Sequence, residues 1–369
     1  MKHKVALIIP TLDQGGAEKQ LCLLATGLTA SQFEVHVIVL TRTGPRESGL
    51  REQNIPVHFI HKRGKFDFQA WQRLRRLLLE LKPDIVHTWI FAANTYGRIA
   101  ALSASVPIIA ASERSVDPWK SSFHLWIDRF LAKRTKRITT NSSGVIDFYS
   151  KHGIPSEYFI RIPNAVTNST VQPISREEAA KRLGVPADRK WILSVGRLWQ
   201  QKGYKDLIWA AEMIRVLRND TCYIIIGEGP ERARLEQYRD NVRAGSQTYM
   251  VGERSDVAEL LPHAEMLWNG SLYEGQSNVI LEAMQSGVPV VASDIPGNTD
   301  LIQHRSTGML YPLGDVERLS RDALDLFNDP DLRAKLVRNA QEFVRVNHSL
   351  ESMIRRHAEL YQGWIRSLR

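Results

Sequence analysis

Residues 264–293, which read AEMLWNGSLYEGQSNVILEAMQSGVPVVAS, contain a complete strand–helix–strand unit. Residues 264–269 and 289–293 are short and mainly apolar, and the helical stretch between them ends near Gly287. Uninterrupted apolar runs of this kind are typical of parallel strands whose two faces are both covered by helices. This stretch therefore predicts a βαβ unit within a parallel sheet.

The same alternation extends through both halves of the chain. Helical patterns separate the apolar runs, for example at residues 68–82, where Trp71, Leu74 and Leu78 lie on one stripe. The predicted strands are residues 5–10, 34–40, 56–60, 84–89, 107–112 and 137–142, followed by 191–196, 221–227, 248–252, 264–269, 289–293 and 308–312. The sequence therefore predicts an α/β fold with two doubly wound, Rossmann-like domains in tandem.

A proline-containing segment, residues 163–190, separates the two series of strands and includes a predicted helix at residues 176–183. We predict an N-terminal domain over 1–165, a C-terminal domain over 166–345, and a C-terminal helix over 346–369 that packs back on the first domain. Doubly wound domains bind ligands at the carboxyl ends of their strands. The active site is therefore expected in a cleft where the two domains face each other.

The composition excludes several classes of protein. With 43% hydrophobic and 24% charged residues, the 369-residue chain is neither disordered nor fibrous. Its two cysteines, Cys22 and Cys222, exclude a disulfide framework and a multi-cysteine zinc module. The first apolar run is too short for a signal peptide, and none reaches the ~20 residues of a membrane span. We expect a cytoplasmic protein, either free or peripheral at the inner face of the membrane.

The net charge of +9 is unevenly distributed. Residues 1–170 hold 23 Lys and Arg against 13 Asp and Glu, whereas the rest of the chain holds 26 against 27. A positive half indicates an anionic partner, which is nucleic acid, anionic lipid or a phosphorylated substrate. A nucleic-acid-binding protein is the weaker interpretation, because no reader motif is present.

Two glycine-containing turns follow predicted strands. Gly15 and Gly16 open a helix after the first strand, which indicates either close approach of an anionic ligand or a plain turn. Residues 196–203, GRLWQQKG, place Arg197 and Lys202 at the end of a parallel strand, where two cations suit a diphosphate. The alternative is a solvated basic turn. Gly15 and Gly16 do not match the G-x-G-x-x-G of NAD-dependent dehydrogenases, and residues 196–203 lack the G-x-x-x-x-G-K-S/T of a P-loop.

Two glutamates flank the start of the helix in the quoted stretch. Glu274 precedes this helix and Glu282 lies within it, while Ser277 or Asn278 is expected to cap it. The free amides of the helix attract an anion, and Glu282 can accept hydrogen bonds from hydroxyl groups. The pattern suits a polyhydroxylated ligand that carries a phosphate. The alternative is an ordinary capped surface helix.

Taken together, these motifs resemble those of the retaining glycosyltransferases of family four (glycosyl transferase group 1), which have the GT-B architecture. The resemblance covers essentially the whole chain and is strongest from residue 191 to 312. It rests on GGAE (15–18), IPNAV (162–166), GRLWQQKG (196–203), GEGPER (227–232), VGERSDVAELL (251–261) and SLYEGQSNVILEAMQSGVPVVAS (271–293). It implies transfer of a hexose from a nucleotide sugar, expected to be a UDP-sugar, in cell-surface polysaccharide biosynthesis.

The resemblance implies a role for each matching residue. Arg197 and Lys202 would hold the donor diphosphate and stabilise it as it leaves, and Glu274 would act on the donor sugar. Glu282 would bind the ribose hydroxyls. The remaining donor-binding positions would be Gly15, Gly16, Gly252, Glu253, Arg254, Gly275, Gln276, Ser277, Asn278 and Val279. No metal or other cofactor is implied, because protein cations replace it.

The sequence departs from the family at the fourth strand. Where relatives often carry a histidine or an acid two residues after a first histidine, this chain has Trp89 after His87. His87 is either a sugar-contacting residue or a buried strand histidine, and Trp89 or Asn94 is expected to shape the sugar pocket instead. The D-x-D string at Asp329 to Asp331 is interpreted as a helix cap and not as a metal site.

Residues 123–137, FHLWIDRFLAKRTKR, form an amphipathic pattern with a basic end. We expect either a sheet-covering helix or a membrane-surface helix. One face would carry Phe123, Trp126, Ile127, Phe130 and Leu131, and the basic end holds Lys133, Arg134, Lys136 and Arg137. The positive first domain predicts a polyprenyl-diphosphate-linked glycan or another anionic lipid as acceptor. A non-catalytic binding protein on the same scaffold is disfavoured by the intact basic pair and glutamates.

Overall fold

The computed structural model describes residues 2–30, 32–64, 67–167 and 172–368, and it divides the chain into two compact units. Unit 1 comprises Met1–Ala165 and Leu350–Arg369, and unit 2 comprises Val166–Ser349. Each unit is a parallel sheet with helices on both faces. None of the described helices is long and apolar enough to cross a bilayer.

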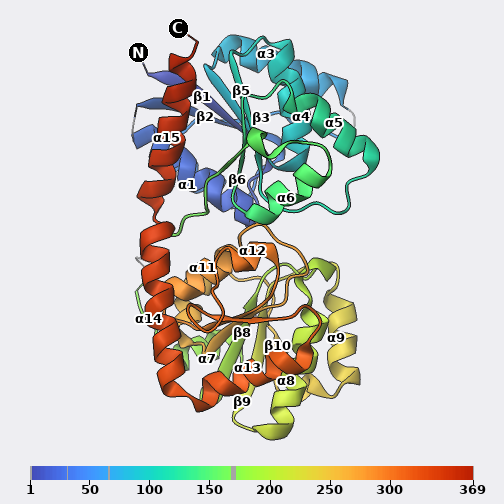
Figure 1. The fold of residues 1–369 in the computed structure, drawn as a ribbon, viewed down its shortest axis with the longest axis vertical. Helices are drawn as coiled ribbons and strands as arrows, with labels where there is room; N and C mark the ends of the chain where they lie inside the picture. Colours follow the sequence, from blue (N-terminus) through green and yellow to red (C-terminus); the bar gives the residue numbers. More distant parts are fainter. Residues whose placement is uncertain (1, 31, 65–66, 168–171, 369) are drawn as a thin grey trace. The chain divides into compact units, whose positions relative to one another are not determined.

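Unit 1 contains a seven-stranded parallel sheet in the order β3-β2-β1-β4-β5-β6-β7 (Figure 1). The strands are β1 (His3–Thr11), β2 (Phe33–Arg42), β3 (Val57–Phe59), β4 (Ile85–Trp89), β5 (Ile108–Glu113), β6 (Ile138–Thr140) and β7 (Phe159–Arg161). The helices are α1 (Gly16–Ala30), α2 (Glu47–Glu52), α3 (Phe68–Leu81), α4 (Ile90–Ser103), α5 (Ser122–Ala132), α6 (Ser143–Lys151) and α15 (Leu350–Arg366). All six predicted strands are present, and β7 is an additional one.

The uninterrupted apolar run in β1 has a direct structural cause. Leu7 and Ile9 pack on one face of the sheet with α1 and α15, whereas Ala6 and Ile8 pack on the other face with α3 and α4. Because successive side chains of a strand point to opposite faces, both sets must be apolar. The order of the strands reverses beside β1, where β4 pairs with it. In doubly wound sheets, ligands usually bind at the carboxyl ends of the strands on either side of such a reversal.

Unit 2 repeats the architecture with a six-stranded parallel sheet in the order β10-β9-β8-β11-β12-β13. The strands are β8 (Lys190–Val195), β9 (Thr221–Ile226), β10 (Thr248–Met250), β11 (Met266–Asn269), β12 (Val290–Ser293) and β13 (Met309–Tyr311). The helices are α7 (Arg176–Leu183), α8 (Tyr204–Leu217), α9 (Arg232–Asn241), α10 (Val257–Leu260), α11 (Asn278–Gln285), α12 (Pro296–Thr299), α13 (Val316–Asn328) and α14 (Pro330–Asn347). The helix predicted at 176–183 is α7.

The C-terminal helix α15 is part of unit 1, where it lies beside α1 (Figure 1). A Cβ atom on Gly27 of α1 would lie 2.0 Å from Cδ1 of Ile354, so a glycine permits this close contact. Tyr361 of α15 is fully buried, and its hydroxyl lies 2.5 Å from Nδ1 of His87 on β4. The helix begins at Leu350, four residues after the predicted boundary.

Candidate functional site

Two loops meet at the carboxyl edge of the sheet in unit 2, one after β8 and one after β11. The backbone N–H of Leu272 donates to the carbonyl of Gln201 at 2.7 Å, and the Gln201 side chain donates to the carbonyl of Tyr273 at 2.7 Å. Gly203 has φ +62°, and a Cβ atom there would lie 2.1 Å from the Gly270 carbonyl oxygen. Only glycine allows the loops to approach this closely.

This docking joins two of the three predicted catalytic side chains. Lys202 Nζ lies 2.6 Å from Glu274 Oε2, and the two side chains are 21% and 16% exposed. The pair is therefore half-buried at the carboxyl end of the sheet. A lysine held by one carboxylate still has two donors for an anionic oxygen.

Arg197 is exposed on the same loop as Lys202. Its guanidinium stacks over the ring of Trp199 at 5.1 Å, and it forms no ion pair with any residue that the structure describes. Stacking on an aromatic ring orients a guanidinium without using its donors. Arg197 can therefore present a bidentate fork to a ligand at this edge.

The start of α11 follows Glu274 and is shaped by an asparagine network. Ser277 is the N-cap residue, yet its side chain accepts from Asn269 Nδ2 at 3.3 Å instead of capping the helix. Oδ1 of Asn269 accepts from the backbone N–H of Ser271 at 3.1 Å. Gly275 is pressed against the next loop, because a Cβ atom on Gly297 would lie 1.9 Å from the Gly275 carbonyl oxygen.

The predicted donor-binding residues are thus placed around one short helix. Gly275, Gln276 and Ser277 are buried before α11, and Asn278 and Val279 are half-buried in its first turn. Glu282 is half-buried one turn further along the helix. The structure brings these residues, the Lys202–Glu274 pair and Arg197 to one edge of unit 2.

Gly252, Glu253 and Arg254 follow β10 at the same edge. The backbone N–H of Gly227 donates to the Gly252 carbonyl at 2.8 Å, and Glu253 is exposed. Arg254 instead donates to both oxygens of Asp256, at 2.8 and 2.6 Å, and to the carbonyl of Arg182 at 3.0 Å. Hydrogen bonding to Asp256 raises the pKa of Arg254. Two of its nitrogens thus hold the loop through Asp256 and the third ties the loop to α7, so Arg254 has a structural role at this edge.

In unit 1, Gly15 precedes α1 and Gly16 is its first residue. A Cβ atom on Gly15 would lie 2.1 Å from Glu18 Oε2, so the glycine leaves room for a carboxylate under the turn. Thr11 donates to Glu18 at 3.2 Å, and burial raises the pKa of Glu18. Gly15 is therefore required at least in part to make room for the Glu18 side chain, and not only for a ligand.

The predicted sugar pocket at β4 needs correction. His87, Trp89 and Asn94 are all fully buried in unit 1. Both nitrogens of His87 have partners, Tyr361 and Thr139, and burial holds its pKa well below the usual value. Asn94 donates to the Ser112 carbonyl at 2.9 Å. His87 and Asn94 are core residues whose polar groups are bonded within unit 1, which confirms the alternative of a buried strand histidine for His87, whereas the buried Trp89 keeps an unpaired indole N–H.

The D-x-D string is a helix cap, as predicted. Asp329 is the N-cap of α14, and its carboxylate accepts from the backbone N–H of Leu332 at 2.8 Å, with Pro330 in the first turn. Within residues 2–368, apart from the gaps stated above, no three His, Cys, Asp or Glu side chains gather as a metal site would require.

Comparison with known proteins tests the family resemblance. Residues 175–343 match the model of the glycosyl transferases group 1, and residues 14–169 match the model of Glycosyltransferase Family 4. The two models together match most of the chain. Each half of the chain thus matches a glycosyltransferase family model, which confirms the resemblance of its motifs to the group 1 glycosyltransferases.

Two curated relatives and one solved structure illustrate the similarity. The UDP-Gal:alpha-D-GlcNAc-diphosphoundecaprenol alpha-1,3-galactosyltransferase of Escherichia coli is 29% identical over 264 residues, 68% of each chain. The lipopolysaccharide core biosynthesis glycosyltransferase LpsD of Rhizobium meliloti is 23% identical over 94% of this chain and 95% of its own. The crystal structure of Anabaena Alr3699/HepE in complex with UDP and glucose has a TM-score of 0.87 at 21% identity, covering 98% and 99% of the two chains. The fold of both units is thus GT-B.

Proposed function

We propose that the protein is a retaining glycosyltransferase that uses a nucleotide sugar, with a UDP-sugar as the preferred donor. The observation that carries this proposal is the Lys202–Glu274 pair beside the exposed Arg197 at the carboxyl edge of unit 2. Two cations there match a diphosphate, and the half-buried Glu282 on α11 offers an acceptor for ribose hydroxyls. The HepE complex, which contains UDP and glucose, supports this choice of donor.

The chemistry follows from where charge develops. The bond from the anomeric carbon to the diphosphate oxygen breaks, and its electron pair stays on the diphosphate. The acceptor hydroxyl bonds to the same carbon from the same face, and its proton passes to the departing phosphate oxygen. Arg197 and Lys202 stabilise that growing negative charge, while Glu274 positions Lys202 and the sugar. Attack on the same face retains the anomeric configuration.

We propose that this reaction requires no metal. A divalent ion usually neutralises a nucleoside diphosphate as it leaves, and here two side chains of fixed positive charge can serve instead. The free amides at the start of α11 add partial positive charge. In this interpretation the protein needs no cofactor, and the nucleotide sugar is a co-substrate.

We further propose that the acceptor is a glycan or a polyprenyl-diphosphate-linked glycan of cell-surface polysaccharide, glycosylated at the cytoplasmic face of the inner membrane. The name of the Escherichia coli relative specifies a diphosphoundecaprenol acceptor, and that of LpsD specifies lipopolysaccharide core. The positive excess of residues 1–170 supports an acceptor with negative charge.

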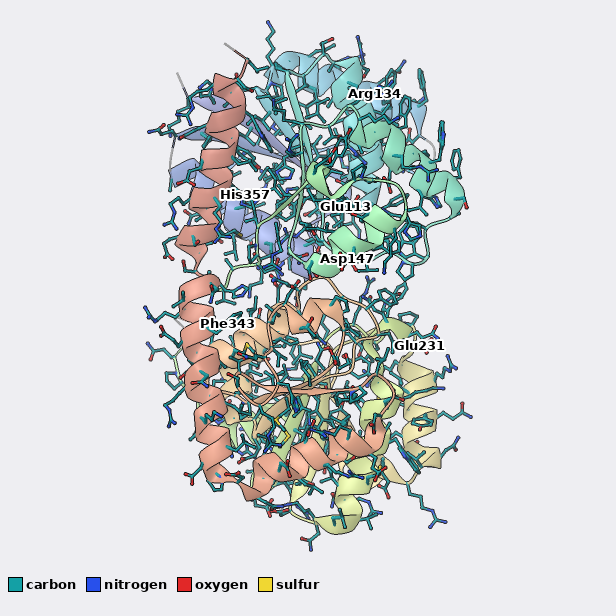
Figure 2. All side chains as sticks on the ribbon, in the orientation of Figure 1. Glu113, Arg134, Asp147, Glu231, Phe343 and His357 are labelled. Atoms are coloured by element: carbon teal, nitrogen blue, oxygen red, sulfur yellow. The ribbon has the colours of Figure 1, made fainter. Side chains whose placement is uncertain are left out.

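The surface of α5 supports contact with an anionic membrane. This helix buries Leu125, Asp128, Leu131 and Ala132. Of the five residues expected on its apolar face only Leu131 is buried, so the prediction that this face covers the sheet is largely wrong. The exposed face of the helix presents the aromatic side chains of Phe123, Trp126 and Phe130, and Trp119 lies in the segment before the helix; these four side chains are 45% to 58% exposed. The exposed cations Lys133, Arg134, Lys136 and Arg137 follow directly, and Figure 2 shows Arg134 at the surface of unit 1. Aromatic rings next to cations suit the interface of an anionic bilayer.

A donor screen tests the enzymatic proposal. UDP-, GDP- and ADP-sugars are compared by thermal shift, and the product of the best donor is examined by proton NMR. We expect UDP-sugars to raise the Tm most and the product to keep the donor's anomeric configuration. An inverted product would refute the retaining mechanism, and the absence of any nucleotide-sugar shift would refute the donor site.

Vesicle flotation tests the membrane proposal. Wild type should bind phosphatidylglycerol vesicles at low salt and leave them at high salt. Changing Phe123, Trp126 and Phe130 to serine, or the four cations to serine, should reduce binding. A matched variant that changes the exposed cations Arg51, Arg76, Lys82 and Lys151 of unit 1 should bind like wild type. Equal loss in this control would indicate a diffuse field and not an α5 surface.

A further inference from the structure

Three neighbouring strands of unit 1 lead into buried polar residues at their carboxyl ends. Trp89 ends β4 opposite Ser112, and Glu113 ends β5 opposite Thr140 of β6. Arg114 and Asn141 are the next residues along their strands and are also buried. Arg114 Nη2 and Asn141 Nδ2 donate to the same atom, Oδ1 of Asn164, which places the two side chains together.

Arg114 is a buried cation without a counter-charge. It is 7% exposed, and within the described part of the chain it forms no ion pair, while its Nη1 has no hydrogen-bond partner. Its guanidinium lies 4.9 Å from the ring of Trp89, which fixes its orientation. Burial lowers the pKa of Arg114 to about 9, so the group remains charged at neutral pH. An isolated buried charge is normally unfavourable.

The surrounding ionisable groups do not supply the missing negative charge. Burial lowers the pKa of both His87 and His357, that of His357 to about 4, and the charge of Arg114 adds to the lowering. Both rings are therefore neutral at pH 7. The adjacent carboxylate, Glu113, lies 3.7 Å from Lys120 Nζ instead. Among the described residues, no carboxylate therefore neutralises the charge of Arg114.

Other unpaired polar atoms surround the guanidinium. The indole N–H of Trp89 is an unpaired donor, and Ser112 Oγ and Asn141 Oδ1 also lack partners. Nδ1 of His357, on α15 (Figure 2), lies 3.0 Å from the Met353 carbonyl, which leaves Nε2 as an unpaired acceptor. Donors beside a cation suit phosphate oxygens, and the neutral acceptors suit hydroxyl groups.

The predicted glycine turn borders the same edge. Gln20, in the second turn of α1, donates to the carbonyl of Ala165 at 2.7 Å and accepts from its backbone N–H at 2.9 Å. Ala165 directly follows Asn164, the partner of Arg114. The start of α1 is therefore tied to the segment that holds the guanidinium, and Gly16 in its first turn is exposed.

We propose that Arg114 and Trp89 form a phosphate-binding site in unit 1 that takes the sugar-phosphate end of the acceptor. The ligand class is a glycosyl phosphate or diphosphate, whose oxygens bond to Arg114 Nη1 and Trp89 Nε1. This assignment rests on the proposed function, because it identifies which part of the anionic acceptor unit 1 recognises. No such ligand role follows for His87, whose nitrogens are both satisfied within the core.

Thermal shift with glucose 1-phosphate, and with glucose as the uncharged control, tests the site. Wild type and the Arg197→Ala/Lys202→Ala double variant should both gain Tm with glucose 1-phosphate and not with glucose. Arg114→Met should melt no lower than wild type without ligand, because it removes an unpaired buried charge. The glucose 1-phosphate concentration that gives half of the maximal Tm shift should rise about 10- to 100-fold in Arg114→Met, as expected for a lost charge-assisted hydrogen bond.

Each outcome bears on the proposal. Arg114→Gln, which can still donate to Asn164, replaces the methionine variant if that variant does not melt cooperatively. An unchanged shift in either variant, or no shift in wild type, overturns the site. Failure of both variants to fold would assign Arg114 a structural role and overturn it as well. UDP in the same assay separates the two proposals. If UDP does not raise the Tm of wild type, the donor site in unit 2 is refuted, but the site at Arg114 is not.

Discussion

The Lys202–Glu274 pair allows a quantitative prediction. Lys202→Ala removes one of the two cations of the proposed diphosphate site and leaves Glu274, 16% exposed, without its partner. Removing one group that stabilises developing charge typically reduces kcat by about 10²–10³. The unpaired Glu274 carboxylate also repels the diphosphate, so the upper end of that range is expected. Glu274→Gln keeps a hydrogen-bond acceptor beside Lys202 and should lower the rate less than Glu274→Ala.

Stability should respond far less than rate. Both side chains are partly exposed, so solvent screening limits their attraction to about 1 kcal/mol or less. The loop is held independently by the Leu272 and Gln201 backbone and side-chain bonds and by the Gly203 contact. The Tm of Lys202→Ala should therefore lie within a few degrees of wild type.

The assay measures kcat and KM with the best donor from the screen, alongside Tm. Lys205→Ala is the matched control, because Lys205 lies three residues further on, with its ammonium over the ring of Tyr238 at 5.4 Å. This control should retain near-wild-type turnover. Turnover of Lys202→Ala within a few-fold of wild type would refute the role of Lys202, and a large fall in Tm would mean that the rate loss reports misfolding.

Three further predictions concern the same chain. Arg197→Ala should reduce kcat by about 10²–10³ without lowering Tm, because its exposed guanidinium packs only on Trp199; unchanged turnover would count against the diphosphate role. Activity should survive EDTA, and a complete loss restored by Mg²⁺ or Mn²⁺ would contradict metal independence. Burial lowers the folded-state pKa of His357 to about 4 from 6.5, so the unfolded state binds more protons between these values and stability should fall with falling pH there. His357→Asn should reduce the slope of the free energy of unfolding against pH by at most about 1.4 kcal/mol per pH unit, measured by urea unfolding at pH 4.5 and 6.5.

The fold was accessible from the sequence because its strands are buried on both faces. Leu7, Ile8 and Ile9 pack alternately on opposite sides of one sheet, which leaves a continuous apolar run as its trace. β7 was missed because Phe159–Arg161 is a three-residue edge strand with one buried residue. Such a strand has no periodicity to detect.

The proposed donor site of unit 2 could be predicted for a similar reason. Arg197, Lys202 and Glu274 lie in the loops that follow β8 and β11, and parallel strands bring their carboxyl ends together. The contribution of Asn269 was missed, because a single asparagine at a strand end is indistinguishable from a turn residue. The error at His87 has the opposite cause: its position along the strand was known, but its burial under α15 depends on a helix more than 260 residues away.

The charge of the first half illustrates what only three-dimensional structure can separate. Arg98 and Asp128 form a buried ion pair, and Lys120 lies among Glu113, Asp117 and Asp128, so two of the cations are neutralised inside unit 1. These residues add nothing to the field that an anionic acceptor meets.

Two groups of cations in unit 1 have no such internal use. Those that follow α5 are exposed beside aromatic rings, and Arg114 is buried without a counter-charge. If the acceptor is a lipid-linked glycosyl diphosphate, the two groups act on different parts of it. The α5 surface meets the anionic bilayer, with an energy that falls as salt rises because it is screened by solvent. Arg114 meets one phosphate in a site that excludes water, where screening is weak. High salt should therefore release the protein from vesicles while leaving its affinity for a soluble sugar phosphate largely unchanged, and a parallel loss of both would place the two contacts on the same surface.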